Sequence, residues 1–415
     1  MTDLAETITR VHREEWARVV ASLTRRFGDL DLAEEMAAEA FAVAVERWPT
    51  DGVPPNPGGW ITTTANRRAI DRLRREARRN AKQRGAQMLH DDAPPAPLGP
   101  IDDDRLRLIF TCCHPALSLE ARIALTLRLV GGLTVPEIAS AFLVQETTIG
   151  QRITRAKGKI TAARISYRVP SSEDLPARVS GVLAVLFLIF NEGYLASDPQ
   201  KESVRSDLTL EAIRLTRLVL GLLPDDGEVT GLLALMLLTE ARRGARVSAS
   251  GELVTLDEQD RGAWDVALIA EGHALVRGRI AAVAAGQARP GRYQILAAIN
   301  AVHTSARQAR DTDWSQVVAL YDQLVVLDPS PIVALNRAVA LAELDGPELA
   351  LALVDRLDLL ALGGYHAFHA TRADLLRRVG RSGEARAAYD QAIELVRNTA
   401  EVAYLTRRRD QLKPA

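Results

Sequence analysis

The chain has 415 residues, of which 47% are hydrophobic and 25% are charged. This composition is typical of globular domains and excludes a disordered or fibrous protein, and the length favours two to four domains. The formal net charge is −1, but residues 1–170 carry +4 and the remainder carries −5. The N-terminal part is therefore the better candidate for binding an acidic partner such as nucleic acid.

Residue usage predicts an all-α protein. Only 5% of the residues are aromatic, while the strong helix formers Ala, Leu, Arg and Glu dominate. The two cysteines, Cys112 and Cys113, are adjacent, which prevents a disulfide framework and favours a reducing, cytoplasmic location. The most apolar run, residues 182–190, is short for a membrane span, and the N-terminus lacks the apolar core of a signal peptide. We therefore expect neither secretion nor a membrane anchor.

Two amphipathic helices are predicted between Ile8 and Trp48, because apolar residues recur at helical spacing with a break at Gly28-Asp29. Residues 49–59 contain seven Pro or Gly in eleven positions, which predicts a loop. Helix resumes at Trp60, and residues 60–90 carry nine basic side chains against two acidic ones. Such a one-sided excess favours a phosphate-facing surface, with a merely basic solvated face as the alternative.

The acidic, Pro-rich segment at residues 86–104 has the composition of a linker. A helix from Leu106 to Val130 is predicted after it, and a capping box of Thr134 and Glu137 then starts a new one. A short helix to Phe142, a tight break and a further helix at 146–165 have the spacing of a helix-turn-helix. Six basic and no acidic residues between positions 147 and 168 suit the second helix to the DNA major groove.

The C-terminal half predicts long helices with a repeat. Three similar segments close at Asp322, Asp355 and Asp390, 33 and 35 residues apart, each next to a companion helix. A period near 34 in helix pairs is typical of tetratricopeptide repeats, because each pair exposes an apolar face that a stacked neighbour buries. Between residues 246 and 254, a Ser-Ala-Ser-Gly turn predicts a short hairpin or an ordered loop.

Three motifs in order, DLAEEMAAEAFAVAVERW (31–48), NPGGWITTTANRRAIDRLRRE (56–76) and LEARIALTLRLVGGLTVPEIASAFLVQETTIGQRITRAKGKI (119–160), resemble the extracytoplasmic-function (ECF) sigma factors. The later half, with TEARRGAR and LDEQDRGAWD, resembles the subgroup with a tetratricopeptide-like extension. The resemblance implies two small helical sigma domains and a helical-repeat extension. Its expected divisions are region 2 at 1–85, a linker at 86–104, region 4 at 105–168 and the extension at 169–415.

By resemblance, the chain directs core RNA polymerase to specific promoters and is regulated through its extension, with no cofactor. The polymerase clamp would bind one helix of region 2, through Leu32, Glu34, Glu35, Glu39 and Phe41. The −10 promoter element would be opened and held by Trp60, Asn66, Arg67, Asp71, Arg72, Arg74 and Arg75. The −35 element would be read as duplex by Thr147, Thr148, Gln151, Arg152, Arg155 and Lys157. The acidic linker either threads toward the polymerase cleft or is a passive tether.

The sequence departs from the family pattern at several DNA-facing positions. Leu143 replaces a turn glycine, Gln145 replaces a serine cap, and Gly150 inside the recognition helix costs about 1 kcal/mol in helix propensity. Residues 66–67 read Asn-Arg where Arg-Asn is commoner. These changes put particular base contacts in question without disturbing the fold.

A motif of unknown role precedes the repeats, and its arginines and acids are expected to pair with one another or, less often, to bind a ligand. It comprises Arg242, Arg243, Arg246, Asp257, Asp260, Arg261, Trp264 and Asp265. Cys112-Cys113-His114 is more typical of a packed helix start than of a zinc site, so no metal is expected.

Two rival hypotheses remain at this point: a helix-turn-helix regulator that binds duplex DNA without polymerase, and an enzyme in the C-terminal half that uses the Arg/Asp loop. No catalytic motif supports the second. We expect truncation after about Arg168 to change activity, through loss of a regulatory contact with a protein or with the chain itself, while both DNA-binding units stay folded.

Overall fold

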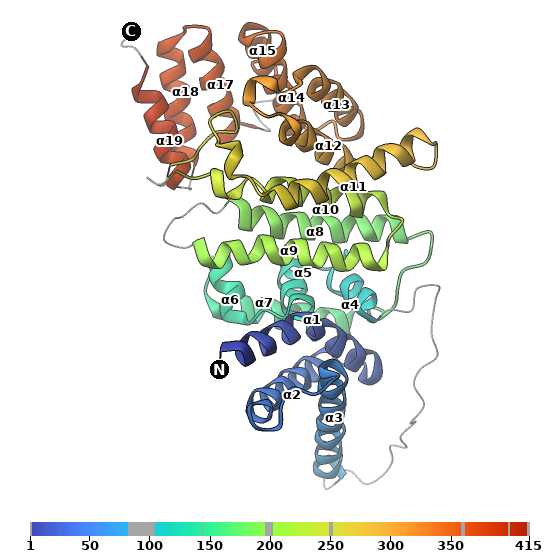
Figure 1. Ribbon diagram of the computed structural model, residues 1–415. Coiled ribbons are helices and arrows are strands. Elements are labelled where there is room, and N and C mark those ends of the chain that lie inside the picture. The colour runs from blue at the N-terminus through green and yellow to red at the C-terminus, as the bar shows by residue number, and fades with distance from the viewer. Residues whose placement is uncertain are drawn as a thin grey trace. The chain divides into compact units, whose positions relative to one another are not determined.

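The structure is a computed structural model that describes residues 2–81, 104–142, 144–195, 202–248, 252–357, 362–396 and 399–412. It divides into two compact units, Met1–Ile189 and Phe190–Ala415. In the described residues, regular secondary structure is helical apart from one isolated antiparallel bridge, Val247 with Leu253 (Figure 1). The all-α prediction is confirmed, and the bridge is consistent with the expected short hairpin or ordered loop, whose turn residues 249–251 lie outside the described residues.

The first unit begins with three helices that pack on one another: α1 (Thr2–Phe27), α2 (Leu30–Asp51) and α3 (Pro57–Ala81). Gly28 ends α1 with a φ of 69°, a conformation that glycine adopts without strain. The Asp29 carboxylate then caps α2 by accepting hydrogen bonds from two first-turn amides. The predicted break at Gly28-Asp29 is confirmed.

The loop between α2 and α3 is shorter than the eleven residues predicted. Helix α2 continues through Pro49 into its final turn. Helix α3 begins at Pro57, where the missing N–H of proline has no helical partner to lose. The Asn56 side chain accepts from the Gly59 amide at 2.9 Å. The proline content correctly predicted a break between α2 and α3, but it did not predict the residues at which α2 ends and α3 begins.

Five short helices follow the linker: α4 (Asp104–Cys112), α5 (Leu119–Leu125), the π-helix η1 (Thr126–Gly131), α6 (Val135–Ala141) and α7 (Glu146–Ala162). The single helix predicted from Leu106 to Val130 is wrong. Helix α4 ends at Cys112, and Ser118 caps α5 by accepting from the Ala121 amide. Cys112-Cys113-His114 therefore marks a helix end and not a helix start. Of the linker, residues 86–103 lie outside the described residues, as does Leu143.

Helix α8 (Leu175–Leu195) spans the division between the units, and its first turns pack on α4. Arg178 Nη2 donates to the Phe110 carbonyl at 2.6 Å, and its guanidinium lies 5.9 Å from the Phe110 ring centre. The compact first unit thus runs past residue 168, where we expected region 4 to end.

Among the described residues, one segment, Leu175–Tyr194, is apolar and long enough to cross a membrane, although the run 182–190 alone was too short. A core helix meets the same criteria.

The second unit contains helix pairs. Its helices are α9 (Glu202–Leu222), α10 (Gly227–Glu240), η2 (Arg243–Ala245), η3 (Arg261–Ala263), α11 (Val266–Ala284), α12 (Arg292–Ser305), η4 (Ala309–Asp311), α13 (Trp314–Leu327), α14 (Pro331–Leu344), α15 (Pro347–Val354), α17 (His366–Arg378), α18 (Ser382–Leu395) and α19 (Thr399–Asp410). The three repeated segments fall in α13, α15 and α18, and helices α14 and α17 are their companions. Successive helices bury a shared apolar core, as expected of stacked repeats.

Candidate functional site

Helix α3 has one buried face and one exposed arginine-rich face. Its buried positions, Gly58, Ile61, Ala65 and Ala69, recur every three or four residues against α1 and α2. The opposite face carries the exposed residues Arg67, Asp71, Arg74, Arg75 and Arg78. Together with Glu39 and Arg68, the last four line a shallow cavity of about 610 Å³. Its excess of guanidinium groups gives this surface the chemistry of a phosphate-binding face.

Two other candidate residues of α3 are engaged within the domain. The Asn66 amide donates to the Thr62 carbonyl at 3.0 Å, and Arg26 donates to the Asn66 oxygen at 3.5 Å. The Trp60 ring packs edge-on against the buried Trp48, with 5.7 Å between ring centres. A base-reading Asn66 would have to give up these bonds, and Trp60 is partly buried by its contact with Trp48.

The acidic residues of α2 face the arginines of α3. Arg68 Nη1 lies 2.5 Å from Glu39 Oε2, and Arg72 pairs with Glu35. All four side chains are between 35% and 50% exposed, so each pair contributes little stability and can be exchanged for another partner.

The two apolar residues assigned to polymerase binding lie in the core. Leu32 is 8% exposed and Phe41 is 6% exposed. The Phe41 ring contacts His12 and Trp16, at 4.7 and 5.9 Å between ring centres. Neither can contact another protein unless the domain opens, because α2 turns them toward α1.

Helix α7 presents a polar face opposite its buried residues. Ile149, Ile153, Ala156 and Ile160 are buried. Of the candidate DNA contacts, Arg152 is half-buried, and the exposed ones are Thr147, Thr148, Gln151 and Arg155. Gln145 forms no side-chain cap at the start of the helix. The helix thus has the arrangement expected of a recognition helix, with short polar and cationic groups at its N-terminal end.

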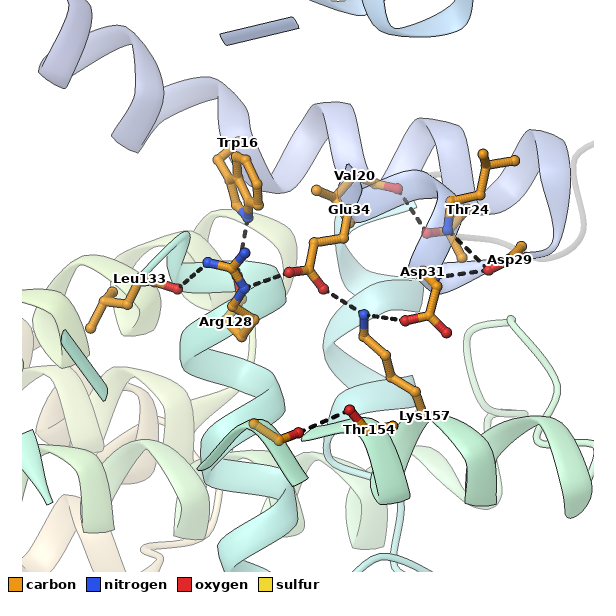
Figure 2. Close-up of polar contacts among 12 residues, drawn as sticks. Trp16, Val20, Thr24, Asp29, Asp31, Glu34, Arg128, Leu133, Thr154 and Lys157 are labelled. Atoms are coloured by element: carbon orange, nitrogen blue, oxygen red, sulfur yellow. Dashed lines mark hydrogen bonds and ion pairs between the residues drawn. The ribbon is translucent and has the colours of Figure 1, made fainter. Parts of the chain in front are cut away.

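Lys157 is the exception, because it points away from this face into region 2. Its side chain is 8% exposed, and Nζ lies 2.7 Å from Asp31 Oδ1 and 2.5 Å from Glu34 Oε2 (Figure 2). Burial lowers the pKa of Lys157, but the two carboxylates outweigh it, so the pKa is raised and the amine stays charged. The prediction that Lys157 contacts DNA is therefore wrong for this arrangement, since the amine is enclosed.

A second cation from region 4 reaches the same carboxylate. Arg128 Nε lies 2.5 Å from Glu34 Oε1, and Arg128 Nη1 donates to the Leu133 carbonyl at 2.8 Å (Figure 2). The Trp16 indole N–H donates to the Arg128 carbonyl at 3.2 Å. Asp31, Glu34, Arg128 and Lys157 are called the clasp below. Sequence reasoning missed Asp31 and Arg128, because a pairing between helices about a hundred residues apart leaves no local pattern.

The arginines of the C-terminal motif do not pair with its acids in the described residues. Arg242 donates to the Asn300 side chain at 2.7 Å, and Arg243 pairs with Glu240 at 2.6 Å. Arg246 donates to the Tyr194 carbonyl at 2.7 Å, with its guanidinium 4.0 Å from that ring centre. These arginines bond to neighbouring helices, as structural pairing of the loop would require, but their partners are not the acids of the motif.

The remaining motif residues shape the connection between α10 and α11. Asp260 caps η3, Asp265 caps α11, and Asp257 is exposed. Arg261 donates to two backbone carbonyls at the end of α12 and stacks over the buried Trp264, 4.7 Å from the ring centre. Asp257 and Arg261 also line a cavity of about 750 Å³ in the second unit. The caps and the Arg261 contacts therefore hold the loop between α10 and α11 in place.

The cysteines are buried free thiols, and burial raises the pKa of Cys113 to about 11. Among the described residues, no group of three or more His, Cys, Asp or Glu is arranged to hold a metal ion.

The pairing of a basic helix in one small helical domain with a helix-turn-helix in the next defines a sigma factor, and comparisons with known proteins identify its two regions. Residues 13–79 match the family "Sigma-70 region 2" and residues 107–160 match "Sigma-70, region 4". Residues 178–280 match a family of unknown function, DUF6596. No solved structure matches the chain.

One similar protein spans nearly all of the chain, and two similar sigma factors each cover less than half of it. The chain is 42% identical to the uncharacterized protein R00370 of Rhizobium meliloti (strain 1021) over 402 residues, 95% of this chain and 93% of that protein. It is 28% identical over 196 residues to the probable ECF RNA polymerase sigma factor SigI of Mycobacterium tuberculosis (strain ATCC 25618 / H37Rv), covering 44% of this chain and 66% of that protein. It is also 28% identical over 146 residues to the ECF RNA polymerase sigma factor SigK of Mycobacterium ulcerans (strain Agy99), covering 34% and 75%.

The chain belongs to the ECF sigma factors and carries a C-terminal helical extension. It functions in promoter-specific initiation of transcription. Region 2 distinguishes it from a helix-turn-helix regulator that acts without polymerase, and sigma factors are not a class of enzymes.

Proposed function

We propose that the exposed acids of α2, Glu35 and Glu39, together with Glu34, bind basic groups of the polymerase clamp. Among the described residues, Glu35 and Glu39 are half-exposed and pair with the partly exposed Arg72 and Arg68, so exchange for a polymerase cation costs little. The buried Leu32 and Phe41 are left out of this surface. They support it from below by fixing the face of α2 that carries the acids.

The −10 element is assigned to the exposed row of α3. Among the described residues, neither Arg67 nor Arg74 has a carboxylate partner, and Arg75 contacts only the Asp71 carbonyl, at 3.3 Å. Cations without local partners are free to neutralise phosphates of the separated strand. This division of exposed charge, acidic on α2 and arginine-rich on α3, is the observation that carries the proposal.

The −35 element is assigned to the exposed face of α7, with Thr147, Thr148 and Gln151 near base edges and Arg152 and Arg155 on phosphates. Side chains at the N-terminal end of a recognition helix reach base edges, while longer cations fix its register on the backbone. Lys157 is omitted because it lies in the clasp.

Removal of charged or polar side chains from α3 and from α7 tests the assignment of these helices to the −10 and −35 elements. The change Arg74→Ala with Arg75→Ala is predicted to lower the slope of log affinity against log salt for a template with an open −10 segment by about 0.7 for each lost phosphate contact. Gln151→Ala with Arg155→Ala is expected to weaken binding to the −35 duplex while sparing the open template. The control is Arg10→Ala, an exposed arginine of α1 paired with Glu14. Equal effects of all three changes would contradict the assignment.

The extension is proposed to regulate initiation inside the cell, through a protein partner or through the sigma domains themselves. One observation supports an intramolecular route: the extension belongs to the same chain as both DNA-binding regions, and α8 continues from the first unit into the second. The domain boundaries expected from the sequence remain a proposal, in which we now assign the start of α8 to the compact first unit.

A further inference from the structure

The clasp occupies both oxygens of one carboxylate that the proposed function gives to polymerase. Glu34 Oε1 pairs with Arg128 and Glu34 Oε2 pairs with Lys157, and the Glu34 side chain is only 14% exposed. Asp31, which is 75% exposed, holds Lys157 from the outer side. A polymerase cation can reach Glu34 only after Lys157 or Arg128 has moved away.

The contact around the clasp is broad enough to hold region 4 against region 2. Tyr167 donates to the Ala21 carbonyl at 3.0 Å and also lies 3.0 Å from the Asp104 carbonyl. Arg25 of α1 pairs with Asp104 at 3.5 Å. At Gly132, a side-chain carbon would meet the Trp16 ring at 3.0 Å, which shows how closely the two regions approach. The arrangement is therefore a packed interface with a charged centre.

The DNA-facing groups of both regions remain outside this interface. Gln151 and Arg155 on α7 and Arg74 and Arg75 on α3 are exposed in the same arrangement. The closed form thus encloses the Glu34 carboxylate and leaves these polar and basic groups open.

We propose that the clasp is an autoinhibitory contact: region 4 encloses Glu34 of region 2 with Lys157 and Arg128, and core polymerase must displace these two cations to reach it. This inference rests on the proposed use of Glu34 in polymerase binding. The occupant of the surface is identified by charge complementarity, since a lysine and an arginine of the chain satisfy the same carboxylates that a basic polymerase surface would. Release of Lys157 then couples polymerase binding to the separation of the two regions.

The test uses the full chain and a bacterial core RNA polymerase. Lys157→Met removes the charge and keeps most of the apolar stem, and Lys159→Met is the matched control, because Lys159 is an exposed cation on the same helix. Dyes on cysteines introduced at Glu46 and Gln151 report the separation of the regions by energy transfer. Both native cysteines are at most 3% exposed and so escape labelling.

We expect Lys157→Met to tighten core binding by about tenfold, within the usual range of coupling between two sites, and to lower energy transfer in the free chain. Lys159→Met should change neither quantity. Tyr167→Phe removes two hydrogen bonds at the interface without changing the clasp, and it keeps the proposal testable if Lys157→Met does not fold. This variant should also tighten core binding and lower energy transfer.

Three results would overturn the inference. Weaker core binding by Lys157→Met would mean that Lys157 itself contacts polymerase. Lower energy transfer with unchanged affinity would show that the contact exists but does not restrain binding, and the proposed polymerase surface would then survive. Failure of the wild type and of every variant to bind core would remove both proposals.

Discussion

Thr134 and Glu137 cap each other at the start of α6. The Thr134 amide donates to Glu137 Oε2 at 2.6 Å, and the Glu137 amide donates to Thr134 Oγ1 at 3.3 Å. This is the capping box that the sequence predicted. It fixes where the first helix of the helix-turn-helix begins, and so where α7 can be placed against DNA.

Thr134→Ala should therefore destabilise region 4 by about 1 kcal/mol, the usual cost of losing a side-chain cap. Thermal unfolding of the full chain measures the change, and binding to the −35 duplex should weaken with it. Thr134→Ser, which keeps the hydroxyl, is the control and should behave as the wild type. Equal loss from the serine and alanine variants would argue against the cap.

Glycines in region 4 differ in what they can tolerate. Gly150 lies inside α7 with no atom within 4 Å of a side-chain carbon built there, so Gly150→Ala should stabilise the chain by about 0.5–1 kcal/mol. Gly132 has a φ of 78° and abuts His12 and Trp16, so Gly132→Ala should destabilise it. Denaturant unfolding of both variants checks the opposite signs. A loss of stability in Gly150→Ala would contradict the prediction that a side chain at this position meets no neighbouring atom.

His303 should make the stability of the second unit depend on pH. Burial, and then the charges of Arg242 and Arg261, lower the pKa of His303 to about 4 from 6.5. The unfolded chain therefore binds more protons between these two values, so the contribution is fully present above about pH 6.5 and is lost as the pH falls toward about 4. Its size is about 3 kcal/mol, as an order of magnitude.

Urea unfolding across this pH range measures the effect of His303. The variant His303→Gln should lose part of the slope of stability against pH, because it cannot take up the proton. A variant that keeps the full slope would show that other groups cause it.

The sequence predicted the helical class, the capping box and the helix pairs, because each depends on short-range spacing, and the resemblance to a known family supplied both sigma regions. It misplaced the ends of α2 and α3 and merged α4 with α5, because proline fits the first turn of a helix and Ser118 starts a new helix inside an apolar run. The sequence could not reveal the clasp, because Lys157 and Glu34 are 123 positions apart. Each is a charged residue of a kind that usually lies exposed on a helix. Two of the motif arginines, Arg242 and Arg246, also have their partners 58 and 52 positions away in the sequence.

Helix α8 should be needed for a stable region 4. Arg178→Ala removes the hydrogen bond to the Phe110 carbonyl and the contact with its ring, which should cost about 1–2 kcal/mol. Arg168→Ala, at an exposed arginine, is the control. Thermal unfolding of the two variants measures the difference, and only Arg178→Ala should unfold at a lower temperature than the wild type. Truncation after Arg168 discards α8 and uncovers α4, so we now expect it to destabilise region 4 as well as to change activity.

Mapping of RNA 5′ ends tests the central claim most directly. Core polymerase is supplied with a library of genomic fragments from the source bacterium, with and without the purified full chain. The account predicts a new set of start sites in the presence of the chain, preceded at fixed spacing by two shared sequence elements. An identical map of start sites with and without the chain would contradict it.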